Sequence, residues 1–349
     1  MGIFTHNNVK NISFSPNVRW YNNSMVNAFA NCRNFNSPVT IPNGVTNTHY
    51  AFYNCANFNS PVTIPNSVSY MFGTFYRCNN FNTVPTIQNG ITNLHGLFYE
   101  ACNFNQQITI PDGVTSVSSM FGNCRIFNQP ITIPNSVTDT RSMLTGCSNF
   151  NQPITIPNSV TNTAYMFNYC SNFNQPITIP DGVTSTTYMF YYCTNFNHQV
   201  TIPGTVTNTA YMFAGIYNYN HPVVIPDGVT NMSGMFYICR NLKQSITIPS
   251  MVTNLSNTFA QCNNIYNIKI LSNDVTNACN MLYGKANNVR VNIYINGNST
   301  SKTFNSIVIG NNSYASIVGK AWTKSSNTSN YCFYNTTYNI YVYYNQTLT

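Results

Sequence analysis

The residues that could carry acid–base chemistry are few and widely spaced in this chain. Among 349 residues there are six acidic side chains and five histidines. Asp112, Asp181 and Asp227 share the sequence Ile-Pro-Asp-Gly, which is typical of a tight turn. Because the three aspartates occupy equivalent turns, we do not expect them to form the close carboxylate pair that acid–base catalysis uses.

The histidines and cysteines do not follow a metal-binding pattern. A zinc site draws on clustered Cys or His residues, and no Cys-x-x-Cys pair occurs. His198 and His221 are expected to stack about 5 Å apart, and two surface histidines explain this pair better than a metal site. No phosphate loop, nucleophile motif or dinucleotide fingerprint is present. We therefore predict no catalytic residue, no metal and no cofactor, and a protein that is not an enzyme.

Ten of the 12 cysteines recur at almost regular intervals. We interpret them as one column of a repeat, in which Ile216 takes the place of one cysteine. Because an apolar residue substitutes there, buried reduced thiols explain the pattern better than disulfides. The column is Cys32, Cys55, Cys78, Cys102, Cys124, Cys147, Cys170, Cys193, Cys239 and Cys262.

A repeat of 23 residues positions most of these side chains. Each step from Phe35 reaches another aromatic residue as far as Tyr219, and an unbroken column of asparagines follows the aromatic column. A fixed period of this length indicates a solenoid. The phenylalanines of the column are Phe35, Phe58, Phe81, Phe104, Phe127, Phe150, Phe173 and Phe196.

One repeat combines an extended segment, a turn and a short helical segment. Ile131-Thr132-Ile133 alternates inward and outward positions as a strand does, and Ile-Pro-Asn then predicts a corner. The apolar spacing that follows predicts one or two turns of α-helix, or a 3₁₀ helix, between Asn162 and Tyr169. The asparagines on either side of the aromatic residue are expected to bond to backbone groups of neighbouring coils. The predicted fold is an α/β solenoid with a parallel β-sheet on one face.

The repeats divide the chain into three predicted parts. Residues 1–28 form an N-terminal cap, residues 29–285 form about eleven repeats, and residues 286–349 form a small β-rich C-terminal cap or attachment domain. In this last part, strand-like runs begin at Val289, Asn305 and Asn339.

Charge and hydropathy limit the partners. Charged residues make up 6% of the chain, and no run of five basic residues occurs despite the net charge of +8, so we expect no nucleic-acid partner. No stretch of 18 apolar residues and no signal-peptide core is present, so we expect no membrane insertion.

The segment from Phe150 to Cys170, FNQPITIPNSVTNTAYMFNYC, resembles the BspA-like leucine-rich repeat. It is also similar to FNIP repeats and to the repeats of mycoplasma-type surface proteins. The resemblance covers residues 29–285, with Phe where the leading Leu of the family usually stands. It implies a leucine-rich-repeat fold and a non-catalytic role in adhesion or recognition.

Two surfaces of the predicted solenoid carry similar residues in successive repeats. A row of exposed threonines, from Thr40 to Thr201, follows the strands, and an ice-binding function is weakly supported because one row is not a flat double array. On the opposite side the candidate partner-binding residues are outward tyrosines. Mutual stacking that only covers this side remains the alternative. The candidates are Tyr165, Tyr169, Tyr188, Tyr192 and Tyr211.

We expect a recognition or attachment protein on the surface of a virion, by analogy with the Asn-rich, Tyr-rich composition of phage structural proteins, or an extracellular protein. Its partner would be a protein or glycan on a cell surface, or a neighbouring virion protein, and it could form oligomers. The alternatives are a structural decoration protein of an assembly and a secreted bacterial or protist adhesin.

Overall fold

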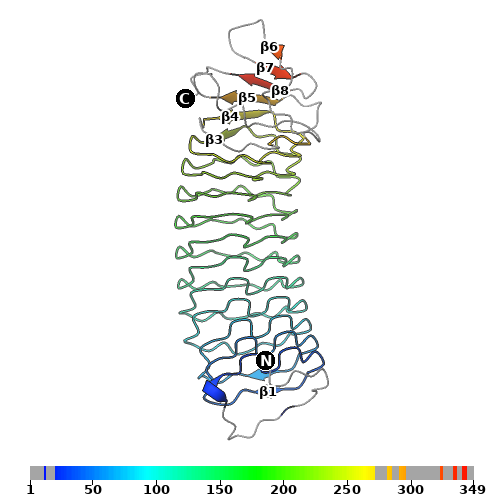
Figure 1. The fold of residues 1–349 in the computed structure, drawn as a ribbon, viewed down its shortest axis with the longest axis vertical. Helices are drawn as coiled ribbons and strands as arrows, with labels where there is room; N and C mark the ends of the chain where they lie inside the picture. The colour runs from blue at the N-terminus through cyan, green and yellow to red at the C-terminus, as the bar shows by residue number, and fades with distance from the viewer. Residues whose placement is uncertain are drawn as a thin grey trace. The chain divides into compact units, whose positions relative to one another are not determined.

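The computed structural model describes residues 12, 20–271, 281–284, 291–295, 323–324, 333–335 and 340–343. The chain divides into two compact units, Met1–Gln175 and Pro176–Thr349. Within each unit the backbone winds in successive coils (Figure 1). Most of the predicted N-terminal cap lies outside the described residues, and the predicted boundaries at 28 and 285 stay predictions.

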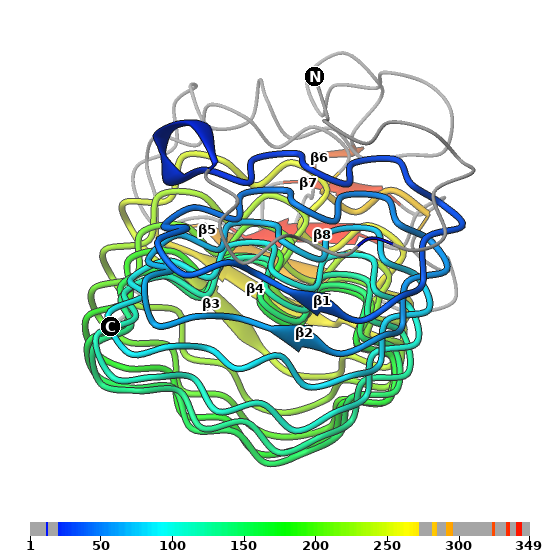
Figure 2. The same ribbon diagram turned by 90° about the horizontal axis from the view of Figure 1, so that it is seen from below.

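The described part of the first unit contains one short helix and two short strands. The 3₁₀ helix η1 spans Tyr21–Asn23, β1 spans Val39–Thr40 and β2 spans Val62–Thr63. β1 and β2 pair in parallel with Val39 opposite Val62, and they lie side by side in successive coils (Figure 2). The valines are buried and the threonines exposed, as the alternation predicts.

The second unit holds a six-stranded sheet in the order β3-β4-β5-β8-β7-β6. Neighbours from β3 to β8 are parallel, and β7 pairs antiparallel with both β8 and β6. β5 and β8 match the runs predicted from Val289 and Asn339, whereas the run from Asn305 lies outside the described residues. The strands are β3 Ile246–Ile248, β4 Asn267–Ile270, β5 Val291–Ile295, β6 Thr323–Lys324, β7 Phe333–Asn335 and β8 Ile340–Tyr343.

The predicted parallel sheet is formed only in part of the repeats. At Ile131-Thr132-Ile133, for example, the isoleucines are buried and the threonine is exposed, but no strand is assigned. Prolines at both ends remove backbone donors and keep any ladder short, and equivalent prolines flank β1 and β2, which are only two residues long. In the described coils, this side of the solenoid is therefore recognised by its alternation of buried and exposed residues and not by a continuous sheet.

The prediction of a helical turn between Asn162 and Tyr169 was wrong. Tyr165 and Tyr169 have φ angles of 60° and 58°, which neither an α-helix nor a right-handed 3₁₀ helix contains. The amide of Met166 bonds to the carbonyl of Thr163, and the amide of Cys170 bonds to that of Phe167, so the segment consists of consecutive β-turns. These turns return apolar residues to the core every three or four positions, which is why the sequence pattern resembled a helix. No α-helix lies among the residues that the structure describes.

Every second amide of a turn segment links two coils. Ser142, Leu144 and Gly146 donate to the carbonyls of Ala164, Met166 and Asn168 at 2.9, 3.0 and 2.7 Å. The amides between them close turns within their own coil. This alternation satisfies the backbone without a helix and fixes the stacking of successive turn segments.

Aromatic rings and thiols fill the core. Phe52 and Phe58 stack at 4.7 Å within one coil, and each stacks on its counterpart in the next. The Cys147 thiol donates to the carbonyl of Phe121 at 3.0 Å, and burial raises its pKa far above the ordinary value. The column assignment needs one correction: Ala101 is the buried residue of that coil, and Cys102 lies beside the column, partly exposed.

The asparagine columns bond between coils: the second column bonds to backbone groups, as predicted, whereas the first column bonds mainly from side chain to side chain. The side-chain amide of Asn57 donates to the side-chain oxygen of Asn34 at 3.2 Å. In the second column the side-chain oxygen of Asn128 accepts the backbone amide of Asn151 at 2.9 Å. These bonds satisfy donors that the corner would leave unpaired.

Candidate functional site

Residues with a left-handed backbone conformation, that is with a positive φ, lie along one outer side of the turn segments. Each described segment from Asn27 to Gln261 has two of them, four residues apart, with φ between 51° at Tyr50 and 69° at Asn31 for the non-glycine members. The residues between them, such as Met166 and Phe167, are buried. Within each unit, we call the surface formed by the two left-handed columns, and by the column three residues after the first, the turn face of that unit. All five predicted tyrosines belong to its left-handed columns.

Three of the predicted tyrosines come together in the second unit. Tyr188 and Tyr211 stack with ring centroids 4.7 Å apart and an interplanar angle of 11°. Tyr191 contacts Tyr188 at 5.0 Å and Tyr192 at 4.7 Å. The cluster is thus a continuous aromatic surface within this unit.

Two further tyrosines extend this surface, and sequence reasoning missed them together with Tyr191. Tyr217 meets Tyr192 edge to face at 6.4 Å and lies under the guanidinium of Arg240 at 5.2 Å. Tyr237 meets Tyr211 at 6.5 Å. Tyr191 and Tyr237 occupy the third column of the turn face, so a search of every column for aromatic residues would have found them.

The other two predicted tyrosines lie in the first unit. Tyr165 is 38% and Tyr169 is 50% exposed, so both side chains are outward as predicted. The backbone carbonyl of Tyr165 accepts a hydrogen bond from the Thr145 hydroxyl at 2.8 Å.

A second aromatic cluster in the first unit was not predicted. Tyr50 contacts Tyr53 at 5.4 Å and Tyr76 at 5.6 Å, and Tyr76 stacks on Tyr99 at 4.6 Å. Tyr50 shares its column with Tyr165, and Tyr53, Tyr76 and Tyr99 recur with the same 23-residue spacing. The periodicity therefore contained the signal for this cluster.

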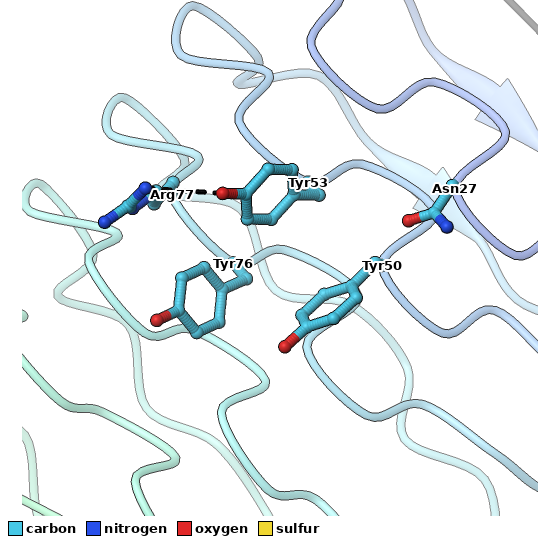
Figure 3. A pocket seen from close by; sticks show the side chains of 5 residues that line it. All are labelled: Asn27, Tyr50, Tyr53, Tyr76 and Arg77. Carbon is cyan, nitrogen blue, oxygen red and sulfur yellow. Dashed lines mark hydrogen bonds between the residues drawn. The ribbon is translucent and has the colours of Figure 1, made fainter. Parts of the chain in front are cut away.

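Three tyrosines of this second cluster, Tyr50, Tyr53 and Tyr76, line an open hollow of about 460 Å³ together with Asn27 and Arg77 (Figure 3). Arg77 donates to the Tyr53 hydroxyl at 3.3 Å and to the Glu100 carboxylate at 2.8 Å. Burial, with the neighbouring Tyr99 and Glu100, raises the pKa of Tyr76 to about 12. Its hydroxyl is therefore protonated and able to donate at neutral pH.

Glycines receive the tyrosine rings of the preceding coil. A Cβ at Gly73 would overlap the ring of Tyr50, and a Cβ at Gly234 would overlap that of Tyr211. The same relation joins Tyr99 to Gly122 and Tyr192 to Gly215, where the nearest ring atoms would lie 2.5 and 2.7 Å from the added Cβ. In each pair the glycine follows the tyrosine by one repeat, so the rings pack flat against the next coil.

The other candidates from the sequence are placed as follows. Asp112, Asp181 and Asp227 are exposed in turns, and His221 bonds to Asn197 at 3.0 Å. Within the described ranges, no three His, Cys, Asp or Glu residues gather as a metal site would require. No helix in the described part of the chain is long and apolar enough to span a membrane.

Comparisons with known proteins point to a repeat family. A family model described as "Mycoplasma protein of unknown function, DUF285" matches residues 23–132, 86–178, 116–224, 181–262 and 230–340. The crystal structure of a leucine-rich repeat protein from Bacteroides ovatus ATCC 8483 is similar with a TM-score of 0.57 and 19% identity, covering 78% of this chain and 73% of that chain. This similarity shows the fold, a repeat solenoid of the leucine-rich type.

A second structure is a leucine rich cell surface protein from Faecalibacterium prausnitzii A2-165. It matches with a TM-score of 0.46 and 23% identity, covering 70% of this chain and 75% of that chain. The search of curated proteins gave no match.

Proposed function

The chain belongs to the DUF285 family, a BspA-like group of leucine-rich-repeat proteins, and from this premise we propose that it is a non-enzymatic recognition protein. Its binding surface is the turn face, and its partner is a protein or glycan on a cell surface. The observation that carries the proposal is the gathering of tyrosines on this face, in one cluster in each unit.

Clustered surface tyrosines suit recognition for a physical reason. A tyrosine offers a large apolar area and a hydroxyl, and it loses little conformational entropy on binding because it has only two side-chain torsions. Here the rings also lie against glycines or against one another, so they are already ordered before a partner arrives. Preorganised contacts lower the entropic cost of binding.

Two of the three acidic side chains of the first unit are engaged in ion pairs, which supports a binding role over a catalytic one. Glu100 pairs with Arg77 and Asp139 pairs with Arg141, each at 2.8 Å. Both carboxylates are therefore engaged in ion pairs on the surface. A catalytic acid or base usually sits in a cleft with a pKa shifted for proton transfer.

We further propose that the protein acts outside the cell, on a virion surface or as an extracellular protein. The motivation is the composition, with 6% charged residues and many neutral polar side chains. Immunogold imaging of purified particles from the source tests the virion assignment. Particles without the label would contradict it and leave an extracellular adhesin. The proposal also keeps the predicted division of the chain into an N-terminal cap (1–28), the repeats (29–285) and a C-terminal part (286–349).

Cell binding tests the function itself. The labelled full chain would be titrated onto a panel of bacterial and mammalian cells by flow cytometry. We expect saturable binding that the double variant Tyr188→Ala/Tyr211→Ala, the double variant Tyr50→Ala/Tyr76→Ala, or both reduce at least tenfold. The matched control is Thr132→Ala/Thr155→Ala, which changes exposed residues away from the turn face. Absence of binding to every cell type, or equal loss in the control, would contradict the proposal.

A further inference from the structure

The hollow in the first unit has rings whose orientations are fixed. The ring of Tyr50 lies against Gly73, where no Cβ could be accommodated without moving the ring. Tyr76 is held by its stack on Tyr99, with an interplanar angle of 19°, and the hydroxyl of Tyr53 is held by Arg77. The hollow is therefore built before any ligand binds.

The rings form a corner with apolar walls. The planes of Tyr50 and Tyr76 meet at 88°, and those of Tyr50 and Tyr53 at 63°. A ligand in this corner would contact the face of one ring and the edge of another (Figure 3). Such walls favour a ligand with at least one apolar face.

Polar groups at the rim have free hydrogen-bonding capacity. Among the described residues, no hydrogen bond engages the side-chain amide of Asn27 or the hydroxyls of Tyr50 and Tyr76. An amide offers two donors and an acceptor, and a phenol offers one donor and an acceptor. The rim therefore favours a ligand that carries several hydroxyl groups.

The charge of the hollow is balanced. Its one cation, Arg77, is bonded to the carboxylate of Glu100 at 2.8 Å, which leaves no net charge for an anionic ligand. A neutral ligand fits this balance better than a sulfate, phosphate or carboxylate. The volume of about 460 Å³ lies within the range of roughly 300–1,000 Å³ that is usual for small-molecule sites.

We propose that the hollow of Asn27, Tyr50, Tyr53, Tyr76 and Arg77 is a subsite for a neutral sugar of a cell-surface glycan. A pyranose has an apolar C–H face that can lie on a tyrosine ring and equatorial hydroxyls that can reach the rim. This inference rests on the proposed function and gives it a ligand class. A proline-rich peptide, which also docks on aromatic residues, is the alternative that the test must separate.

A glycan array tests the ligand class. The full chain would be applied to arrays of neutral and anionic glycans and, in parallel, to an array of proline-rich peptides. We expect binding to a subset of neutral glycans that share one terminal sugar. Binding to anionic glycans only, to peptides only, or to nothing would overturn the subsite.

Matched pairs of variants locate the site. Tyr50 and Tyr211 occupy the same left-handed column with φ of 51° and 54°, and each lies against a glycine, Gly73 or Gly234. The structural effect of a change is therefore comparable in the two units. The affinity for the best neutral oligosaccharide would be measured by isothermal titration calorimetry. We expect Tyr50→Ala and Gly73→Ala to weaken this affinity at least tenfold. The affinity of Tyr211→Ala and Gly234→Ala should stay within twofold of that of the unaltered chain.

Two further readouts separate this inference from the proposed function. Tyr76→Phe removes one rim hydroxyl and should weaken sugar binding about three- to tenfold without changing the thermal midpoint. Cell binding that is lost in Tyr188→Ala/Tyr211→Ala but intact in Tyr50→Ala would overturn the sugar subsite and retain the proposed function. Cell binding unaffected by any turn-face variant would overturn both.

Discussion

At the scale of single residues, the molecule holds many side chains in a backbone conformation that glycine adopts most easily. Left-handed residues other than glycine cost about 1–2 kcal/mol each. Here tyrosine, arginine, serine and glutamate occupy such positions, for example Tyr50, Arg77, Glu100 and Ser142. The reason is the turn: its third residue has a positive φ in type II geometry, and that geometry aims the side chain outward.

Ser142→Gly should stabilise the protein. Ser142 has a φ of 54° as the third residue of the turn closed by the amide of Met143 and the carbonyl of Thr140. Relief of the left-handed strain exceeds the extra entropy of glycine in the unfolded chain, so the expected gain is about 0.5–1 kcal/mol. Urea unfolding measures it. Ser142→Ala keeps the strain and should give no gain; equal gains in the two variants would contradict the explanation.

Tyr219→Phe should stabilise the second unit. Tyr219 stands in the column of core phenylalanines and is fully buried, and its hydroxyl has no hydrogen-bond partner among the residues that the structure describes. Removing an unpaired buried hydroxyl is expected to gain about 1–2 kcal/mol. The control is Tyr237→Phe, at a half-buried position, which should change the unfolding free energy by less than about 0.5 kcal/mol. A destabilised Tyr219→Phe would show that the hydroxyl has a favourable role.

At the scale of elements, each repeat consists of corners joined by turn segments. The amino-acid sequence predicted the corners better than the turn segments. Phe, Ile and Val columns, the Pro-Asn corners and the inter-coil asparagine bonds follow directly from periodicity and side-chain chemistry. The turn segment did not: Val160, Thr163, Phe167 and Cys170 have helical spacing, yet consecutive turns bring the same residues inward. Hydrogen bonds to the next coil decide between the two structures, and a single repeat contains no information about them.

Only part of the candidate site was predicted from the sequence, for a similar reason. Tyr188, Tyr192 and Tyr211 were recognised because they fall in consecutive repeats with the regular Met-Phe sequence. Tyr50 and Tyr76 were not, although Tyr50 shares the column of Tyr211. The role of Gly73 and Gly234 depends on where a ring of the preceding coil lies, and that position is visible only in three dimensions.

The asparagine column allows a test of its acceptor role. The side-chain oxygen of Asn128 accepts the amide of Asn151 at 2.9 Å and the side chain of Gln152 at 3.3 Å. Asn128→Ala leaves these donors unpaired and should cost about 1–2 kcal/mol, whereas Asn128→Asp keeps an acceptor and should cost clearly less. Urea unfolding of the two variants gives the comparison. Equal losses would mean that the amide group, not the acceptor oxygen, stabilises the corner.

At the scale of the whole molecule, a row of buried thiols links stability to pH. Burial raises the pKa of the thiols of Cys78, Cys124 and Cys147 far above that of a thiol in the unfolded chain, about 8.5. A raised folded pKa means that the stabilisation is complete below the unfolded pKa and is lost as pH rises beyond it. The unfolding free energy should therefore be level from pH 7 to 8 and fall above about pH 9.

A triple variant isolates the thiol contribution. Replacement of Cys78, Cys124 and Cys147 by Ala, the residue already present at Ala101 in this column, removes three such groups. Each contributes a slope of about 1.4 kcal/mol per pH unit well above its unfolded pKa. Under reducing conditions, the variant should lose stability above about pH 9 less steeply than the unaltered chain. Identical slopes would show that the thiols ionise in the folded protein.

The central claim is that the turn face is the binding surface, and a footprint of the bound chain tests it most directly. Hydroxyl-radical oxidation, read by mass spectrometry, would compare the free chain with the chain bound to cells. We predict that Tyr53, Tyr76, Tyr191 or Tyr237 become protected on binding, while Met251, which is 56% exposed away from the turn face, is oxidised equally in both states. Protection of Met251 with unchanged oxidation of all these tyrosines would contradict the claim.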